Sequence, residues 1–361
     1  MSLNHILMHR ASEIPTAALR LLPAEMAHDL GLFVLKNKIH RILPRPAFQT
    51  NIDLSMKVKG IGDLPHPIGL AAGFDKNGVA IEGFNDLGFS FLEIGTVTPR
   101  PQAGNSKPRI FRLSDQSGII NRMGFNNHGI EAMKKKLEEG RYKDRGITFG
   151  INLGKNKDTS LDHAISDYMI GLRETLTYGS YFVINISSPN TPGLRELASE
   201  AFLNALAAEI RLQHPGQLSK IWVKMDPDLG KQDFQAVVEV IAINGFAGLV
   251  LTNTHRVEKP HGGGQSGHSV GIMSTLRLEW AYEVTRGKIP MIGVGGILSG
   301  IDIYEKVIRG ASIVQIYSAM IYRGPWTVQK MLMELEWELK LRGFNSLKEA
   351  YATYYGSKVE R

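Results

Sequence analysis

The residues best suited to chemistry follow the apolar, β-branched run Tyr181–Ile186, where small hydroxyl and amide side chains begin. Proline lacks the amide hydrogen that a strand interior needs, so the strand ends by Pro189. The loop around it carries Ser188, Asn190 and Thr191. Such groups bind a polar substrate, and an activated serine removes a proton from it. The same residue types also build ordinary turns, so this loop alone leaves both interpretations open.

Four successive predicted strands each carry one polar residue near the C-terminal end of an apolar run: Asn152, Asn185, Lys224 and Thr252. Burying an unpaired amide or ammonium costs several kcal/mol. Four at matching heights therefore predict one polar ligand with many hydrogen-bonding atoms, such as a planar heterocycle. Taken singly, each also fits a strand-end cap or, for Lys224, an ion pair with Asp226.

The last two predicted strands end in short segments, of which only the first, Gly293–Ile297, is rich in glycine. Gly293–Ile297 and Gln315–Ser318 lie where backbone amides and a helix N-terminus commonly bind a phosphate. A further group, Gly262–Gly267, follows the sixth strand and either closes over the same phosphate or forms a flexible loop. Because glycine also serves ordinary tight turns, these segments are weak evidence by themselves.

Other candidate binding residues follow the first strand and the rim segment after the second. Lys76, within Ala71–Gly78, is a cation for an anionic substrate or a cofactor edge, or else an ordinary solvent-facing lysine. Asn121–Phe125 supplies an amide, a guanidinium and an aromatic ring, and Asn190 and Asn253 add further amides. This set favours a pyrimidine-like ring that bears a carboxylate.

The composition, 361 residues with 43% hydrophobic and 21% charged, is typical of a globular enzyme. The absence of cysteine excludes disulfides, thiolate metal sites, iron–sulfur ligation and a cysteine base. A formal charge of +7 suits anionic small molecules or lipid; nucleic acid is the weakest partner, because only Lys134–Lys136 is densely basic. Without a signal peptide or a membrane-length apolar run, we expect an intracellular protein.

The pattern of elements predicts an α/β fold, a (β/α)₈ barrel, because short β-rich runs alternate with helical patterns long enough for crossovers. An open doubly wound sheet is the alternative, but its Gly-x-Gly-x-x-Gly turn is missing. The strands are Ile68–Phe74, Phe91–Thr98, Ile147–Leu153, Phe182–Ser187, Ile221–Met225, Gly248–Asn253, Met291–Val294 and Ile313–Tyr317. The helical patterns include Leu161–Leu176, Glu200–Leu212, Phe234–Asn244, Leu276–Arg286 and Ile301–Arg309.

Two segments interrupt the alternation: Pro99–Asn126, with hairpin-like runs at Arg109–Leu113 and Gly118–Asn121, and Ser188–Leu197. Long loops at this rim of a barrel usually cover a ligand. The first fifty residues differ again, with prolines bracketing apolar helical patterns that carry more basic than acidic residues. They are either an amphipathic helix pair on an anionic membrane surface or a helical cap docked on the barrel.

Six segments together resemble class 2 dihydroorotate dehydrogenase, over nearly the whole chain: Ala71–Gly78, Gly95–Pro99, Asn121–Phe125, Ile151–Lys157, Asn185–Arg195 and Gln315–Ser318. The resemblance implies an FMN-dependent barrel that oxidises dihydroorotate to orotate in pyrimidine synthesis with a membrane quinone as acceptor. Residues 1–50 would be a helical membrane and quinone-binding extension and 51–361 the catalytic domain. It further implies peripheral attachment at the cytoplasmic face of the inner membrane, without nucleic acid or an obligate protein partner.

The resemblance also implies roles for individual residues. Ser188 would take the C5 proton of dihydroorotate, with a path past Thr191 and Phe125 to water, while hydride leaves C6 for flavin N5. No metal is implied. Substrate contacts would be Lys76, Asn121, Arg122, Met123, Gly124, Phe125, Asn185, Asn190, Asn253 and Thr254. FMN contacts would be Ala72, Gly73, Phe74, Asp75, Lys76, Thr96, Asn152, Asn185, Lys224, Thr252, Gly267, Gly296, Tyr317 and Ser318.

The soluble classes of this family use cysteine as the base, and this chain has none. The resemblance places quinone entry between the N-terminal helices, with His28 as a contact. The sequence departs from the family pattern at Asp226, where a small or apolar residue is usual, and in a short loop from His255 to Gly263. Three alternatives stay open: an FMN barrel for another reduced heterocycle, a flavin-free barrel for a phosphorylated metabolite, and a non-catalytic membrane-surface module.

Overall fold

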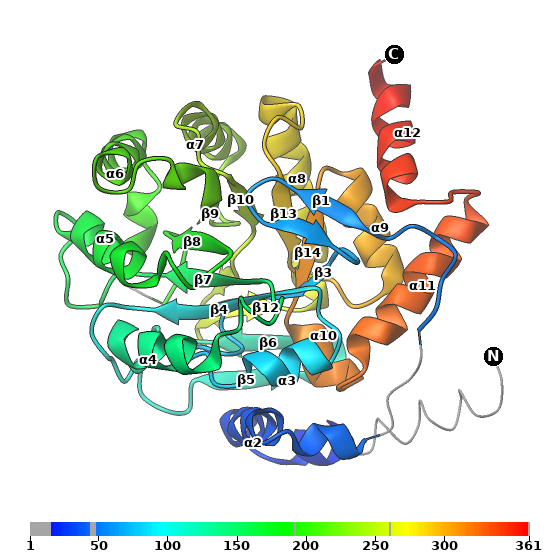
Figure 1. Cartoon of the computed structure of the whole chain (residues 1–361), viewed down its shortest axis with the longest axis horizontal. Coiled ribbons are helices and arrows are strands. Elements are labelled where there is room, and N and C mark those ends of the chain that lie inside the picture. The colour runs from blue at the N-terminus through cyan, green and yellow to red at the C-terminus, as the bar shows by residue number, and fades with distance from the viewer. Residues whose placement is uncertain (1–15, 44–47, 191–192, 260, 360–361) are drawn as a thin grey trace.

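Eight parallel strands close into a barrel in the computed structural model, which describes residues 16–43, 48–190, 193–259 and 261–359 (Figure 1). The barrel closes where β14 pairs with β3. The predicted fold is therefore confirmed, and the open doubly wound sheet is wrong. In chain order the barrel strands are β3 (Ile68–Leu70), β4 (Phe91–Val97), β7 (Phe149–Leu153), β8 (Tyr181–Asn185), β9 (Ile221–Lys224), β10 (Gly248–Leu251), β13 (Met291–Val294) and β14 (Ile313–Ile316).

Helices surround the barrel, as Figure 1 shows. Local capping fixes where two of them begin: Ser199 Oγ accepts the amide hydrogen of Phe202 before α6, and Ser299 forms a capping box with Asp302 before α9. The helices are α3 (Ile81–Asp86), α4 (Ile130–Gly140), α5 (Ala164–Thr175), α6 (Glu200–Gln213), α7 (Lys231–Ile243), α8 (Gly271–Thr285), α9 (Gly300–Ile308), α10 (Ser318–Arg323), α11 (Thr327–Leu341) and α12 (Leu347–Val359). Short 3₁₀ turns are η2 (Ser114–Gln116), η3 (Leu194–Leu197), η4 (Gln217–Lys220) and η5 (His268–Val270).

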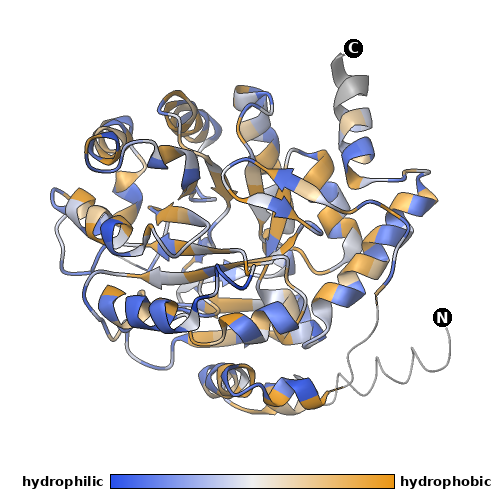
Figure 2. Cartoon of the chain, in the orientation of Figure 1, coloured by the Kyte–Doolittle hydropathy of each residue, from blue (hydrophilic) through white to orange (hydrophobic). Residues whose placement is uncertain are grey.

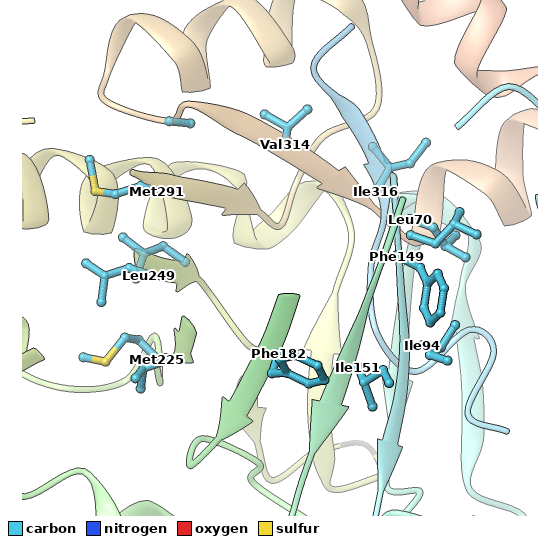
Figure 3. Close-up of a cluster of buried hydrophobic side chains, with 14 of the residues drawn as sticks. Leu70, Ile94, Phe149, Ile151, Phe182, Met225, Leu249, Met291, Val314 and Ile316 are labelled. Carbon is cyan, nitrogen blue, oxygen red and sulfur yellow. The ribbon is translucent and has the colours of Figure 1, made fainter. Parts of the chain in front are cut away.

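The barrel wall separates two hydrophobic clusters. Because strand side chains alternate, Ile221 and Val223 of β9 face the surrounding helices while Trp222 faces the barrel interior. Figure 3 shows the outer cluster, to which β3, β4, β7, β8, β10, β13 and β14 all contribute. A hairpin that the sequence did not reveal, β1 (Met56–Val58) and β2 (Gly62–Leu64), adds to the inner cluster and closes the N-terminal end of the barrel.

A four-stranded antiparallel sheet covers the opposite end. Its strands β5 (Ile110–Leu113) and β6 (Gly118–Asn121) confirm the predicted hairpin-like runs. The segment after β10 adds β11 (His255–Val257) and β12 (Gly263–Ser266), and β12 pairs with β6. Two insertions far apart in sequence thus form one lid sheet over the C-terminal ends of the barrel strands.

The N-terminal helical segment packs beside α3 and β5 at the lower edge of Figure 1. Within its described residues 16–43, the helical parts are residues 16–21, α2 (Ala24–Lys36) and the 3₁₀ turn η1 (Ile39–Ile42). Buried Arg109 forms an ion pair with Glu25 of α2 at 2.8 Å, which attaches the helix to the lid sheet. Figure 2 shows apolar residues along this segment. Within the described ranges, we find no helix with the length and apolar character to cross a membrane.

Candidate active site

A layer of polar side chains lies above the inner apolar cluster, because the inward-facing positions of several strands change from apolar to polar toward their C-terminal ends. Glu93 of β4 joins this layer: Asn152 and Gln315 each donate to its carboxylate at 2.7 Å. Asn152 Oδ1 accepts from Thr96 Oγ1 at 2.6 Å and from Asn185 Nδ2 at 3.2 Å. Buried polar groups persist when they satisfy one another in this way.

Lys224 is the exception in this layer. It is 5% exposed, yet its side chain makes no hydrogen bond or ion pair with any described residue. Burial lowers the pKa of Lys224, and the nearby Glu93 carboxylate opposes that shift. Asp226 lies 2.7 Å from Arg195 instead, so the alternative of a Lys224–Asp226 ion pair is wrong. Gln315 Oε1 is likewise buried without a partner among the described residues. Both side chains line one cavity, where a ligand would satisfy them.

This cavity opens at the C-terminal ends of the strands and encloses about 1160 Å³ of empty space, including its solvent-open part. Most of the predicted site residues line it. They are Ala72, Gly73, Lys76, Thr96, Asn121, Met123, Gly124, Phe125, Asn185, Ser188, Asn190, Lys224, Thr252, Asn253, Thr254, Gly267, Gly296, Tyr317 and Ser318. Thr191 lies outside the described residues, so its part in a proton path stays a prediction.

Four predicted site residues do not line this cavity. Arg122 donates to the Pro108 carbonyl at 2.9 Å and lies over the Phe111 ring. Buried Asp75 accepts from the Val79 and Ala80 amides and so holds the turn after β3. The other two are Asn152, which lies in the polar layer beneath, and Phe74, which faces a second cavity.

Ser188 and several amides form one wall. Ser188 is 5% exposed, and its Oγ accepts the Asn190 amide hydrogen at 3.3 Å. The Asn190 side chain reaches Asn121 of β6 at 3.2 Å, and Asn253 donates to Ser187 Oγ at 3.0 Å. Among the described residues, no side chain accepts a hydrogen bond from Ser188 Oγ. The serine is therefore held near a group of amide side chains, without a neighbouring base among the described residues.

Glycines form another part of the cavity wall. Gly296 has φ +74°, and a Cβ built there would lie 2.1 Å from Gly271 Cα at the start of α8. Gly267 has φ +104°, and its Cβ would lie 2.3 Å from Gly118 Cα. Both positions thus require glycine for conformation and for close backbone approach. Ser266 Oγ and Ser318 Oγ, 3.1 Å apart, lie beside them. Such a wall of amides and hydroxyls suits a phosphate.

Lys76 supplies a cation at the edge of the cavity. Its Nζ donates to the Gly73 carbonyl at 2.8 Å. Burial lowers the pKa of Lys76 to about 8, with a further decrease from Arg109 and opposing effects from carboxylates that include Glu25. The side chain is therefore charged at neutral pH.

The second cavity lies between the N-terminal helices and the barrel, encloses about 1120 Å³ of empty space and has mostly apolar walls. Tyr317 lines both cavities. Its ring centroid lies 5.0 Å from that of Phe74, which lies 5.4 Å from His28. Burial, reinforced by Lys76, lowers the pKa of His28 to about 3, so this histidine is neutral. The two cavities thus share Tyr317, Ile110 and Ile119 as wall residues.

The sequence reasoning missed Glu93 and Gln315 as members of the polar layer. Both are fully buried within apolar strands. The signal was present, because a carboxylate inside Phe91–Val97 cannot be buried without partners.

Comparison with known proteins identifies the family. A family model described as dihydroorotate dehydrogenase matches residues 53–339. The chain belongs to the dihydroorotate dehydrogenase family. A relative from Mus musculus, named "Dihydroorotate dehydrogenase (quinone), mitochondrial", is 41% identical over 94% of this chain and 89% of its own. A "Dihydroorotate dehydrogenase (quinone)" from Gloeobacter violaceus is 44% identical over 82% of this chain and 84% of its own.

A solved structure of ligand-free dihydroorotate dehydrogenase from Eimeria tenella superposes with a TM-score of 0.81. It is 36% identical and covers 91% of this chain and 98% of that one. The predicted resemblance to the quinone-dependent class 2 enzymes is confirmed. The chain is a dihydroorotate dehydrogenase, so the three alternatives of another heterocycle oxidoreductase, a phosphorylated-metabolite enzyme and a non-catalytic module are wrong.

Proposed function

We propose that this dihydroorotate dehydrogenase binds FMN in the barrel cavity, with Ser188 as the base, and delivers electrons to a quinone in the second cavity. The single observation that carries the proposal is buried Lys224, unpartnered among the described residues and facing the same cavity as a glycine wall suited to phosphate. A flat anionic cofactor with a phosphate tail satisfies both. When bound, FMN would supply the redox chemistry, as the acceptor of the C6 hydride of dihydroorotate and the donor of electrons to quinone.

The residues of the polar layer fit the flavin ring. Lys224 would hold the ring edge where negative charge develops, and Glu93 favours the charged form of this lysine. Gln315 Oε1 is free to accept a hydrogen bond, as an imide N–H requires. Backbone groups of Gly267 and Gly296, together with Ser318, would bind the phosphate.

The remaining cavity residues fit dihydroorotate. Lys76 would bind its carboxylate, while Asn121, Asn190 and Asn253 bind the ring amides. Ser188 would then remove the C5 proton. A serine with an ordinary pKa is a weak base, so this step needs a proton acceptor beyond the wall. The predicted path past Phe125 and Thr191 to water supplies one.

We also propose that residues 1–50 are an extension that binds quinone and an anionic membrane surface, and that residues 51–361 form the catalytic domain. Residues 1–15 and 44–47 of this extension lie outside the described residues. Support comes from the apolar second cavity and from exposed apolar side chains on this segment. Leu21 is 87% exposed, Ile42 81% and Phe33 56%. Peripheral attachment at the cytoplasmic face of the inner membrane is part of this proposal.

The visible spectrum of the purified protein tests the cofactor and the reaction together. We expect flavin absorption bands that bleach on adding dihydroorotate without oxygen and return on adding a quinone. A colourless protein with full activity would contradict the FMN proposal, and bleaching without recovery would contradict the quinone step.

Filling the second cavity tests the quinone site. Gly31 lines this cavity, and a Cβ placed there meets no atom within 4 Å. We expect Gly31→Phe to slow flavin reoxidation by quinone while flavin reduction by dihydroorotate is unchanged. Leu30→Phe is the matched control, since Leu30 is on the same helix but does not line the cavity. Equal reoxidation rates in the two variants would reject the site.

A further inference from the structure

The turn after β9 contains two acids, Asp226 and Asp228, that the reaction described above does not use. The family resemblance leads one to expect a small or apolar residue where Asp226 stands. Asp226 is only 3% exposed, and neither acid lines the barrel cavity. A buried carboxylate requires a compensating partner, so its contacts indicate what it does.

The partner comes from the segment that also carries Ser188. Arg195 of η3 follows Ser188 by seven positions. Its Nε lies 2.7 Å from Asp226 Oδ2, and its Nη1 lies 2.9 Å from Asp228 Oδ2. Nε and Nη2 make no aligned hydrogen bond among the described residues, so the attraction is chiefly ionic. One guanidinium is thus held between two carboxylates near the end of the serine loop, which we define as Ser188–Leu197. Residues 191–192 of this loop lie outside the described residues.

Asp228 also holds the lid sheet. His255 Nδ1 of β11 lies 2.5 Å from Asp228 Oδ1, and the Arg256 amide donates to Oδ2 at 2.9 Å. β11 directly follows Asn253 and Thr254, which line the cavity. The same short turn therefore contacts both segments that cover the cavity.

The turn itself is fixed to the barrel. The Asp228 amide donates to Asp226 Oδ1 at 2.9 Å, and Arg277 of α8 donates to the Pro227 carbonyl at 2.6 Å. The Arg277 guanidinium lies 3.9 Å from the ring centroid of Trp280. The turn with the two acids is thus anchored to α8, and not to the loop of Arg195 or to β11, which the acids contact.

We propose that Asp226 and Asp228 are positioning residues, which clamp the serine loop through Arg195 and β11 through His255 so that Ser188 and the amide wall meet the substrate correctly. This inference rests on the proposed function of the cavity. A clamp of this kind acts on substrate binding and proton removal, and leaves cofactor binding and quinone reduction unchanged.

The clamp also gives an expected pH dependence. The charged groups facing Asp226 are Arg195, Asp228 and Arg277, with His255 acting through Asp228. Burial raises the pKa of Asp226 to about 6, and the Asp228 charge acts in the same direction. The hydrogen bond from the Asp228 amide and the charges of Arg195 and Arg277 oppose this shift. Burial raises the pKa of Asp228, but the hydrogen bonds from His255 and Arg256 lower it by more, so its pKa lies below the ordinary value. Below pH 6, Arg195 therefore keeps only one charged partner.

Asp226→Ala tests the clamp, and the family pattern at this position favours a folded variant. We expect KM for dihydroorotate to rise and flavin reduction to slow by about tenfold to a hundredfold. FMN content and the rate of reoxidation by quinone should match the wild type. In the wild type, kcat/KM for dihydroorotate should fall as pH drops below about 6, because Asp226 is then protonated. This fall should be absent from Asp226→Ala. Asp158→Asn is the control, because it removes an exposed ion pair with Arg100 elsewhere on the rim and should change none of these.

A double-mutant cycle with Arg195→Met completes the test. If Asp226 and Arg195 act together, the double variant should reduce flavin no more slowly than the slower of the two single variants. If they act independently, the two rate losses should multiply. Multiplying effects, an unchanged reduction rate in Asp226→Ala, or loss of FMN from it would overturn the clamp. Failure of the proposed function gives a different result from failure of the clamp, because the flavin of the wild-type protein would then not bleach with dihydroorotate.

Discussion

Replacing Gly296 by alanine tests the glycine wall quantitatively. Alanine at φ +74° costs roughly 1–2 kcal/mol, because the left-handed conformation crowds its Cβ. The added Cβ would also lie 2.1 Å from Gly271 Cα and 2.5 Å from Gly271 N, so α8 must shift. Overpacking of this kind costs about 1–3 kcal/mol more. The free energy of unfolding should therefore fall by about 2–5 kcal/mol in total.

Gly245→Ala is the matched control. Gly245 has nearly the same φ, +77°, but a Cβ there meets nothing within 4 Å. It should show only the backbone cost, so the difference between the variants isolates the clash.

Chemical denaturation of cofactor-free protein measures the stabilities, and quenching of flavin fluorescence measures FMN affinity. If the shifted turn loses one hydrogen bond to a charged phosphate, affinity should fall about tenfold to a hundredfold in Gly296→Ala and hardly change in Gly245→Ala. Equal FMN affinities in the two variants would refute a phosphate site at this turn.

Three other predictions concern charge and surface. Lys76 loses its charge as pH rises through about 8, so kcat/KM for dihydroorotate should fall above that pH. Lys76→Arg should move this fall to higher pH. A wild-type kcat/KM that does not change with pH in this range would exclude the carboxylate contact. Lys224→Met removes a buried ammonium that is unpartnered among the described residues. The cofactor-free variant should therefore melt at a higher temperature than the wild type, but bind FMN more weakly. Tighter FMN binding would contradict the proposed contact between Lys224 and the flavin. Replacing the exposed residues Leu21, Phe33 and Ile42 together by serine should reduce the amount of protein that sediments with anionic vesicles, while flavin content is unchanged. Undiminished sedimentation would place the membrane contact elsewhere.

The barrel could be predicted from the sequence because each of its strands is buried on both faces and is therefore a compact apolar run between turns. The lid strands β11 and β12 could not. His255–Val257 and Gly263–Ser266 have neither apolar alternation nor β-branched enrichment. They are strands because β12 finds a partner in β6, more than 140 residues earlier, and such pairing leaves no local signal.

The candidate site was predicted better than its internal connections. The position of Asn152 near the C-terminal end of an apolar run indicated a polar site, but not that Glu93 and Thr96 bind it beneath the cavity. Arg122 and Asp75 belong to segments that line the cavity, yet their side chains turn to neighbouring backbone. Spacing identifies the segment that reaches a site, whereas the direction of each side chain depends on tertiary partners.

The most direct test of the central claim is the rate at which dihydroorotate reduces the bound flavin in Ser188→Ala, followed by stopped-flow absorbance without oxygen. Removing a general base costs about a hundredfold to ten-thousandfold. We predict a loss in this range, with FMN content and the rate of reoxidation by quinone equal to those of the wild type. Flavin reduction at the wild-type rate in Ser188→Ala would contradict the claim that this serine removes the substrate proton.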